Sequence, residues 1–168
     1  MRLFAALPIS IIVALPVSGV AQSHDGHAMA HGDSAYPAMQ ARGKVVMGVD
    51  QYTSVHRFDD LPDGGRIELQ RDRDDSAGTA VIRAHMRAIA RAFAAGDFSA
   101  PATVHFETVP GVLVMRARRG AIRYETDDLP RGAALRIRTS DPEAVAAVHR
   151  FLEYQRREHR AESSTHAH

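Results

Sequence analysis

The 168-residue sequence contains no cysteine and no tryptophan, and Lys44 is its one lysine. The absence of cysteine excludes a disulfide framework, a cysteine nucleophile and a haem attached through Cys-x-x-Cys-His. An excess of charge is also missing, since 21 Lys and Arg balance 20 Asp and Glu. Binding to nucleic acid or to an anionic membrane surface needs a basic excess, so neither kind of partner is expected.

A long hydrophobic run occurs only at the start of the chain. Arg2 precedes an apolar stretch that extends to Val17, and the small residues Ser18-Gly19-Val20-Ala21 follow. This is the layout of a cleavable secretory signal peptide, and the stretch is shorter than the roughly 20 residues that span a bilayer. We therefore predict a signal peptide over residues 1–21, no membrane span, and a periplasmic or secreted mature protein.

The chain after the signal divides by composition into an arm, a domain and a tail. Residues 22–43 are rich in His, Gly, Ala, Ser and Asp without strand or helix periodicity, which predicts a flexible histidine-rich arm. Residues 44–160 suffice for one hydrophobic core and are predicted to form a single domain. Residues 161–168, with His166 and His168, are predicted to be a disordered tail.

Two segments rich in apolar and β-branched residues, 53–58 and 66–70, flank the turn sequence Leu61-Pro62-Asp63-Gly64-Gly65. This arrangement predicts a β-hairpin. An apolar stripe at helical spacing follows, and it predicts a helix between Ser76 and Gly96. The residues of the stripe are Ile82, Met86, Ile89 and Phe93.

The same order recurs in the second half of the domain. Residues 122–126 and 134–138 flank Leu129-Pro130-Arg131-Gly132-Ala133, and Asp141-Pro142 suits the start of a second helix. We predict an α+β fold in which duplicated β-β-α units form one antiparallel sheet with two helices packed on one face. In the linker between the halves, residues 104–106 are predicted to form a short strand and residues 110–118 a helical turn.

Histidine is abundant, and all ten histidines follow the signal. Cleavage after Ala21 would leave Gln22-Ser23-His24 at the terminus, where the amine, two amides and the imidazole can form a square of nitrogens that suits Cu(II) or Ni(II). His27, Met29 and His31 add imidazole and thioether ligands, which serve both oxidation states of copper. The alternative is a solvated segment in which histidines have accumulated without a function.

Further histidines lie on predicted regular elements and face the core. His56 alternates in phase with Phe58 on a strand, and His85 and His149 flank the apolar stripes of the two helices, with His159 returning to the same face. Buried imidazoles need partners, which can be one another, carboxylates or a shared ligand. Each alone is typical of a satisfied core residue, whereas convergence of His56, His85 and His149 would indicate a metal site.

Methionine opens a second possibility for the domain. Met47 and Met115 belong to a residue type that usually fills a core. A thioether beside two imidazoles is nevertheless typical of a copper site or of a non-covalent haem with axial His and Met. The haem or small-ligand alternative assigns His85, His149 and Met115 to the cofactor.

Three functional hypotheses follow. The first is a non-enzymatic periplasmic metal-binding protein, mainly for copper, that buffers the ion or delivers it to a periplasmic metalloprotein or transporter. Its candidate ligands are His24, His27, Met29, His31, His56, His85 and His149. The second is the haem or small-ligand domain. The third is an enzyme with His56 as acid or base beside Asp50 or Glu125, although the sequence has no nucleophile elbow, phosphate loop, dinucleotide or zinc-protease motif.

The sequence MQARGKVVMGVDQYTSVHRF at residues 39–58 resembles the opening of a family of small secreted bacterial proteins without an assigned activity. The resemblance extends through the predicted helix at Ile82-Arg83-x-His85 to the one at Ala147-Val148-His149-x-Phe151-Leu152. Family members tend to carry a second aromatic residue or histidine after His56, where this chain has Arg57. The resemblance implies one compact exported domain whose activity need not involve the arm.

Overall fold

The structure is a computed structural model that describes residues 31–161. The predicted signal peptide, residues 22–30 of the predicted arm and residues 162–168 of the predicted tail lie outside this range. The elements are α1 (His31–Met47), the 3-10 turn η1 (Gln51–Thr53), β1 (Ser54–Leu61), β2 (Gly64–Arg71), α2 (Ser76–Ala94), α3 (Ser99–His105), α4 (Val112–Ala117), the 3-10 turn η2 (Arg119–Ala121), β3 (Ile122–Leu129), β4 (Gly132–Thr139) and α5 (Pro142–His159).

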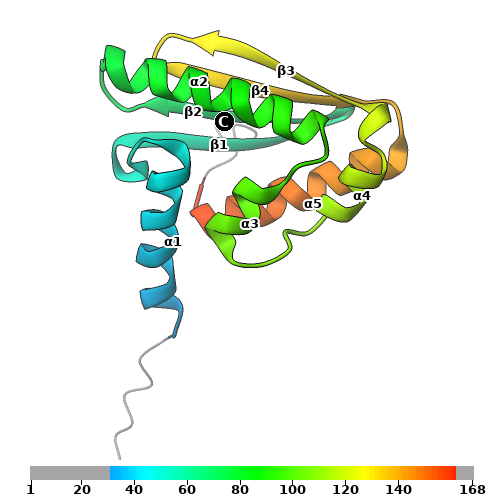
Figure 1. Ribbon diagram of the computed structural model, residues 1–168, viewed down its shortest axis with the longest axis horizontal. Helices are drawn as coiled ribbons and strands as arrows, with labels where there is room; N and C mark the ends of the chain where they lie inside the picture. The colour runs from blue at the N-terminus through cyan, green and yellow to red at the C-terminus, as the bar shows by residue number, and fades with distance from the viewer. Residues whose placement is uncertain (1–30, 162–168) are drawn as a thin grey trace, which may run out of the picture.

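The four strands form one antiparallel sheet in the order β1-β2-β4-β3. The hairpins β1–β2 and β3–β4 pair through their second strands, so β1 and β3 are the edges of the sheet (Figure 1). Both predicted hairpins and the single antiparallel sheet are confirmed. The order strand-strand-helix does occur twice along the chain, while an origin by duplication stays a prediction.

Glycine after each turn allows β2 and β4 to pair closely. Each turn consists of two residues, Pro62-Asp63 and Pro130-Arg131. A Cβ atom added to Gly64 would lie 2.2 Å from the carbonyl oxygen of Ile137, and one added to Gly132 would lie 1.9 Å from that of Leu69. Only glycine fits such an approach of two backbones, which gives the recurring Leu-Pro-x-Gly sequence a structural reason.

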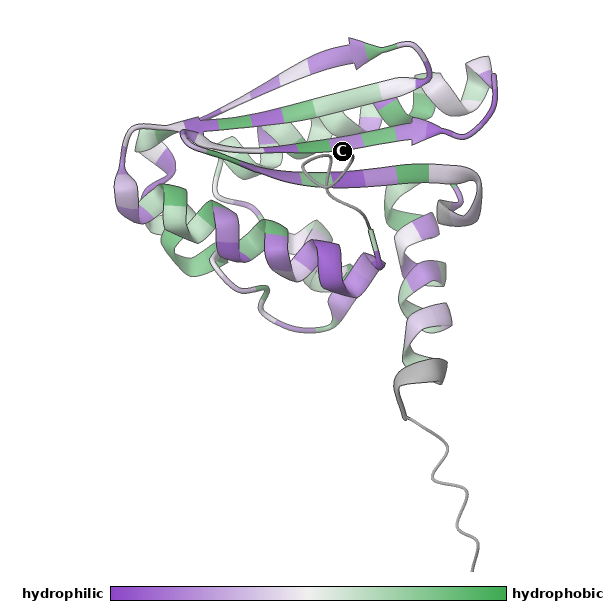
Figure 2. Cartoon of the chain, turned by 180° about the vertical axis from the view of Figure 1, so that it is seen from behind, coloured by the Kyte–Doolittle hydropathy of each residue, from purple (hydrophilic) through white to green (hydrophobic). Residues whose placement is uncertain are grey.

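One face of the sheet is apolar and carries both long helices. Side chains alternate along each strand, so that Phe58, Ile67, Leu135 and their neighbours are buried on the inner face. Helix α2 packs on β4 and β3, and α5 packs on β1 and β2. The prediction of two helices on one face is confirmed. Hydrophilic and hydrophobic residues alternate along the strands in Figure 2.

Both long helices begin as the sequence predicts. The Asp75 carboxylate accepts a hydrogen bond from the Gly78 N–H at the start of α2, and the Asp141 carboxylate accepts bonds from the N–H groups of Glu143 and Ala144 at the start of α5. Such caps stabilise a helix by about 1 kcal/mol. No helix within residues 31–161 has the length and apolar character needed to cross a membrane.

The structure corrects the predicted arm, because residues 31–43 belong to helix α1 and not to a flexible segment. Met39 and Gln40 are buried, and Arg42 donates a hydrogen bond from Nε to the Val104 carbonyl oxygen at 2.7 Å. Pro37 lies inside the helix, and the apolar residues follow no strong helical stripe. Docking against α3 therefore stabilises a helix that composition alone does not reveal.

The structure also corrects the predicted linker. Residues 104–106 do not form a strand, since α3 continues to His105 and Phe106 follows it in a left-handed conformation with φ 57°. The predicted helical turn is present as α4. As a result His105 is the last residue of a helix, and its ring contacts Tyr154 and His159 of α5.

Candidate functional site

Four histidines from four elements line one pocket on the inner face of the sheet, near its β1 edge. They are His56 of β1, His85 of α2, His105 of α3 and His159 of α5. His105 and His159 are the last residues of their helices, and Met47, the last residue of α1, lines the same pocket. Three helix C-termini therefore meet at this place in the fold (Figure 1).

The rest of the pocket wall is almost entirely apolar. The cavity has a volume of about 90 Å³. Gln155 is the one polar side chain besides the histidines among the described residues that line it, and these include no Asp or Glu. The available donors are therefore neutral: imidazole nitrogens, one amide and the thioethers of Met47 and Met86.

His159 is the centre of three imidazoles in contact. Its ring centroid lies 5.4 Å from that of His56 and 5.3 Å from that of His105. Phe58 stacks on His56 at 5.6 Å with an interplanar angle of 10°, and also contacts His159 at 5.7 Å. We call His56, His105 and His159 the histidine cluster. A strand edge and two helix ends thus hold its rings side by side.

Burial keeps these imidazoles uncharged. Partial burial disfavours the cationic form, and together with repulsion from neighbouring histidines it lowers the pKa of His56 to about 4 and that of His159 to about 2. Burial also lowers the pKa of His85 and of His105. At neutral pH the rings are neutral, which is the form that binds a metal.

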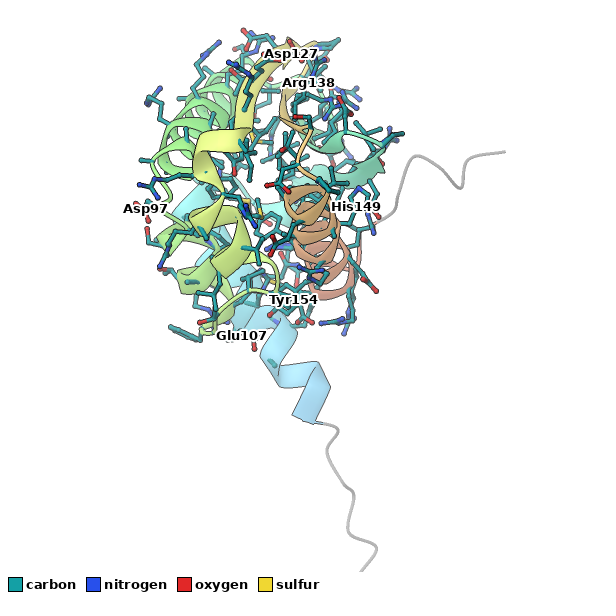
Figure 3. The ribbon with its side chains drawn as sticks, turned by 90° about the vertical axis from the view of Figure 1, so that its right-hand side faces the viewer. Asp97, Glu107, Asp127, Arg138, His149 and Tyr154 are labelled. Carbon is teal, nitrogen blue, oxygen red and sulfur yellow. The ribbon has the colours of Figure 1, made fainter. Side chains whose placement is uncertain are left out.

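Gln155 orients one member of the cluster. The Nε2 atom of His105 lies 3.2 Å from the amide oxygen of Gln155. A carbonyl oxygen only accepts, so this bond places the ring proton on Nε2 and leaves Nδ1 with a lone pair. Tyr154 contacts the same imidazole edge-on at 5.0 Å and donates its hydroxyl hydrogen to Glu107 (Figure 3).

A second cleft gives access to the cluster from outside. It has a volume of about 280 Å³, and His56 and His159 line it as well as the inner pocket. Its other walls include Tyr36 and Gln40 of α1, together with Arg57 and Arg160. The two imidazoles therefore separate a polar outer cleft from the apolar inner pocket.

The structure brings together only some of the predicted ligands. His56 and His85 line the same pocket. His149 does not, because it lies elsewhere on α5 and its Nε2 atom is 2.9 Å from the carbonyl oxygen of Leu61 (Figure 3). Met115 is fully buried in the core and does not line the pocket. The set His85, His149 and Met115 proposed for a haem is therefore not assembled.

The predicted ligands of the arm cannot be placed in the site. His31 begins α1. His24, His27 and Met29 lie outside the described residues. The sequence missed His105 as a site residue, because its segment was predicted as a strand. It indicated the position of His159 through the helical period but did not assign that residue to a site.

The geometry separates the three functional hypotheses. Small-molecule pockets have volumes of roughly 300–1,000 Å³, so a cavity of about 90 Å³ suits an ion or a very small ligand better than a haem. The proposed enzyme partners of His56 are engaged elsewhere: Asp50 accepts from the Tyr52 N–H at 2.9 Å, and Glu125 pairs with Arg138 at 3.8 Å.

The histidine cluster does not have the geometry of a ready-made multi-ligand metal site. Within residues 31–161, no group of three or more His, Asp or Glu side chains is placed to hold a metal ion. The imidazoles of the cluster meet through ring contacts. A metal would therefore require the rings to turn about their side-chain torsions.

Comparison of the chain with protein-family models, curated proteins and solved structures gives no match. The similarity to small secreted bacterial proteins stays an expectation from the sequence. The inner pocket is therefore the feature that bears on function.

Proposed function

We propose that this protein binds a transition-metal ion, chiefly copper, at the histidine cluster and acts as a non-enzymatic buffer or carrier of that ion in the periplasm. The observation that supports the proposal is the contact of three neutral imidazoles, from three separate elements, inside an apolar pocket. Imidazole is a common ligand of copper and zinc.

The spacing of the rings suits a shared ion. A metal lies about 2 Å from an imidazole nitrogen, so the ring centres of two histidines on one ion are about 5 to 6 Å apart. The separations of 5.4 and 5.3 Å around His159 fall in that range. A shared ion would require the side chains to rotate until their nitrogens point to one position.

The surroundings favour a cation although carboxylates are missing from the described wall. The C-terminus of a helix carries a partial negative charge from its free carbonyl groups, worth about 0.3–1 kcal/mol for a nearby cation. Helices α1, α3 and α5 all end at the pocket. Phenylalanine or leucine would fill the same space without the cost of burying a polar ring, so a ligand explains the imidazoles better than packing does.

In this proposal the predicted arm supplies metal to the histidine cluster. His24, His27, Met29 and His31 precede or begin α1, and Tyr36 and Gln40 of this helix line the outer cleft. Metal collected by the arm would pass to His56 and His159 and later to a periplasmic metalloprotein or transporter.

Metal titration of the protein without its signal peptide tests the proposal. Affinities for copper are measured by competition with a chelator for the unaltered protein, for His159→Leu and for His149→Leu. The last is a matched control on the same helix but outside the pocket. We expect His159→Leu to weaken binding by more than the roughly 10–100-fold typical of changes around a ligand, and His149→Leu to leave it unaltered.

Two results would contradict the proposal. One is an affinity no better than millimolar for the unaltered protein. The other is equal affinity in His159→Leu and His149→Leu. A combined replacement of His24, His27 and His31 by alanine separates the arm from the domain. Binding that is lost belongs to the arm, and binding that remains belongs to the domain.

A further inference from the structure

The donor atoms of the inner pocket indicate which ion it takes. We infer that the pocket selects Cu(I) over Cu(II) and Zn(II). This inference rests on the proposed metal-binding function and adds the oxidation state of the preferred ion. Three features carry it: the thioethers in the wall, the charge of the surroundings, and the softness of the donor set as a whole.

Two thioethers share the wall with the imidazoles. Met47 and Met86 both line the inner pocket and are 8% and 3% exposed. Sulfur of this type is a soft ligand that selects Cu(I), whereas imidazole serves several metals. Met86 directly follows His85 on α2, and Met47 ends α1. Soft donors therefore enter the pocket from two different helices.

The charge of the surroundings opposes a divalent ion. The described wall supplies neutral donors and no carboxylate. The cost of moving an ion out of water rises with the square of its charge, so an apolar pocket of this kind disfavours Cu(II) and Zn(II) more than Cu(I). Arg57 and Arg160 line the outer cleft beside His56 and His159, and a positive side chain repels a divalent ion more strongly than a monovalent one.

The donor set as a whole is soft. His159 meets His56 on one side and His105 on the other. The imidazole nitrogens and the thioethers of this wall are softer donors than the tetragonal nitrogen and oxygen ligands that Cu(II) favours. The arrangement therefore fits Cu(I) better than either divalent ion.

The test uses the full mature chain with His24, His27 and His31 replaced by alanine, so that the pocket is measured without the arm. Cu(I) affinity is obtained anaerobically with a chromophoric Cu(I) chelator, and Cu(II) and Zn(II) affinities with chelators at the same pH. We expect Cu(I) to bind at least 100-fold more tightly than Zn(II). Each tenfold preference for Cu(I) over Cu(II) would raise the potential of the bound couple by about 59 mV.

Methionine variants separate this inference from the proposed function. We expect Met47→Leu or Met86→Leu to weaken Cu(I) binding tenfold or more with little change for Zn(II), and to remove a sulfur neighbour from the copper X-ray absorption spectrum. Met115→Leu is the matched control, because Met115 is buried outside the pocket. Equal or tighter binding of Zn(II) or Cu(II) overturns the selection of Cu(I) and leaves metal binding intact. Absence of any metal from the pocket overturns both.

Discussion

The two hairpins carry different side chains at corresponding places on the inner face of the sheet. His56 and Phe58 of β1 stand as far before their turn as Tyr124 and Thr126 of β3 stand before theirs. His56 contacts the ring of His159, whereas Tyr124 packs edge-on to Phe93 at 5.8 Å. The fold accepts an ordinary aromatic ring at this edge position, so the architecture itself does not require imidazoles at the other edge.

The same burial has opposite consequences at the two edges. It raises the pKa of Tyr124, which therefore stays neutral at physiological pH. It lowers the pKa of His56, which is neutral at pH 7 but gains a proton in acid once the chain unfolds. Of these two corresponding positions, the one on β1 therefore responds to acid and the one on β3 does not.

The largest loss of stability is expected at Phe151, which belongs both to the aromatic core and to the wall of the inner pocket. Phe151 contacts Phe93 at 5.9 Å and Phe98 at 6.4 Å, and it also lines the inner pocket. Replacement of Phe151 by alanine should lower the free energy of unfolding by about 3–5 kcal/mol, as measured by urea denaturation. Phe106→Ala is the control, since Phe106 is 76% exposed and should change stability by about 0.5 kcal/mol or less. Similar losses in both variants would refute the role of Phe151.

The second prediction concerns acid stability of the metal-free protein. His56 has a folded pKa of about 4 against an ordinary 6.5, so the unfolded chain binds more protons, and stability falls as the pH drops from 6.5 towards 4. The loss is about 1.4 kcal/mol per pH unit for each such histidine. The titratable and charged groups that share a cavity with His56 are His85, His105, His159, Arg57, Arg160, Tyr36 and Tyr52.

His56→Tyr tests this by copying the residue of the second hairpin into the first. Its free energy of unfolding should depend less steeply on pH than that of the unaltered protein, by about 1.4 kcal/mol per unit between pH 6.5 and 4. Urea denaturation at several pH values measures the slope. An identical slope in both proteins would show that His56 does not titrate as described.

The reverse exchange should carry acid sensitivity to the other edge. In Tyr124→His the new imidazole would be buried against Phe93, and its lowered pKa should add up to about 1.4 kcal/mol per pH unit to the slope below pH 6.5. Tyr124→Phe is the control, because the Tyr124 hydroxyl makes no hydrogen bond within the described chain and its loss should not alter the slope. An unaltered slope in Tyr124→His would contradict the comparison.

The smallest effect is expected from Gln155→Leu. Burial lowers the pKa of His105, and the hydrogen bond to Gln155 partly opposes that shift. Loss of the amide should therefore lower the pKa of His105 further, as seen by NMR titration, while stability changes by about 1 kcal/mol or less. Gln40→Leu removes another buried amide, outside the inner pocket, and should leave the pKa of His105 unaltered.

Local sequence signals were enough to predict the hairpins and the long helices. The Leu-Pro-x-Gly turns reflect the close pairing of β2 with β4 around Gly64 and Gly132, and Asp75 and Asp141 cap the helices that follow. Helix α1 escaped prediction because its stability depends on distant partners, such as the Val104 carbonyl that Arg42 contacts.

The site was only partly predictable for the same reason. The strand and helix periods predicted that His56 and His85 face the core, and both line the inner pocket. The meeting of His105 with His159 joins residues that are 54 positions apart and depends on the tertiary arrangement of the ends of α3 and α5, which no local pattern encodes. His149 lies at the end of β1, where its Nε2 atom is within hydrogen-bond distance of the Leu61 carbonyl oxygen, and not in the pocket.

The position of His159 at the last residue of α5 has a consequence for kinetics. Arg160 follows it in a left-handed conformation, with φ 50°, and ends the helix. Terminal helical turns fray at a small fraction of the free energy needed to unfold the whole domain. The central imidazole can therefore swing away from its neighbours while the sheet and the rest of α5 remain intact. A bound ion would then exchange at the rate of this local opening, long before global unfolding releases it.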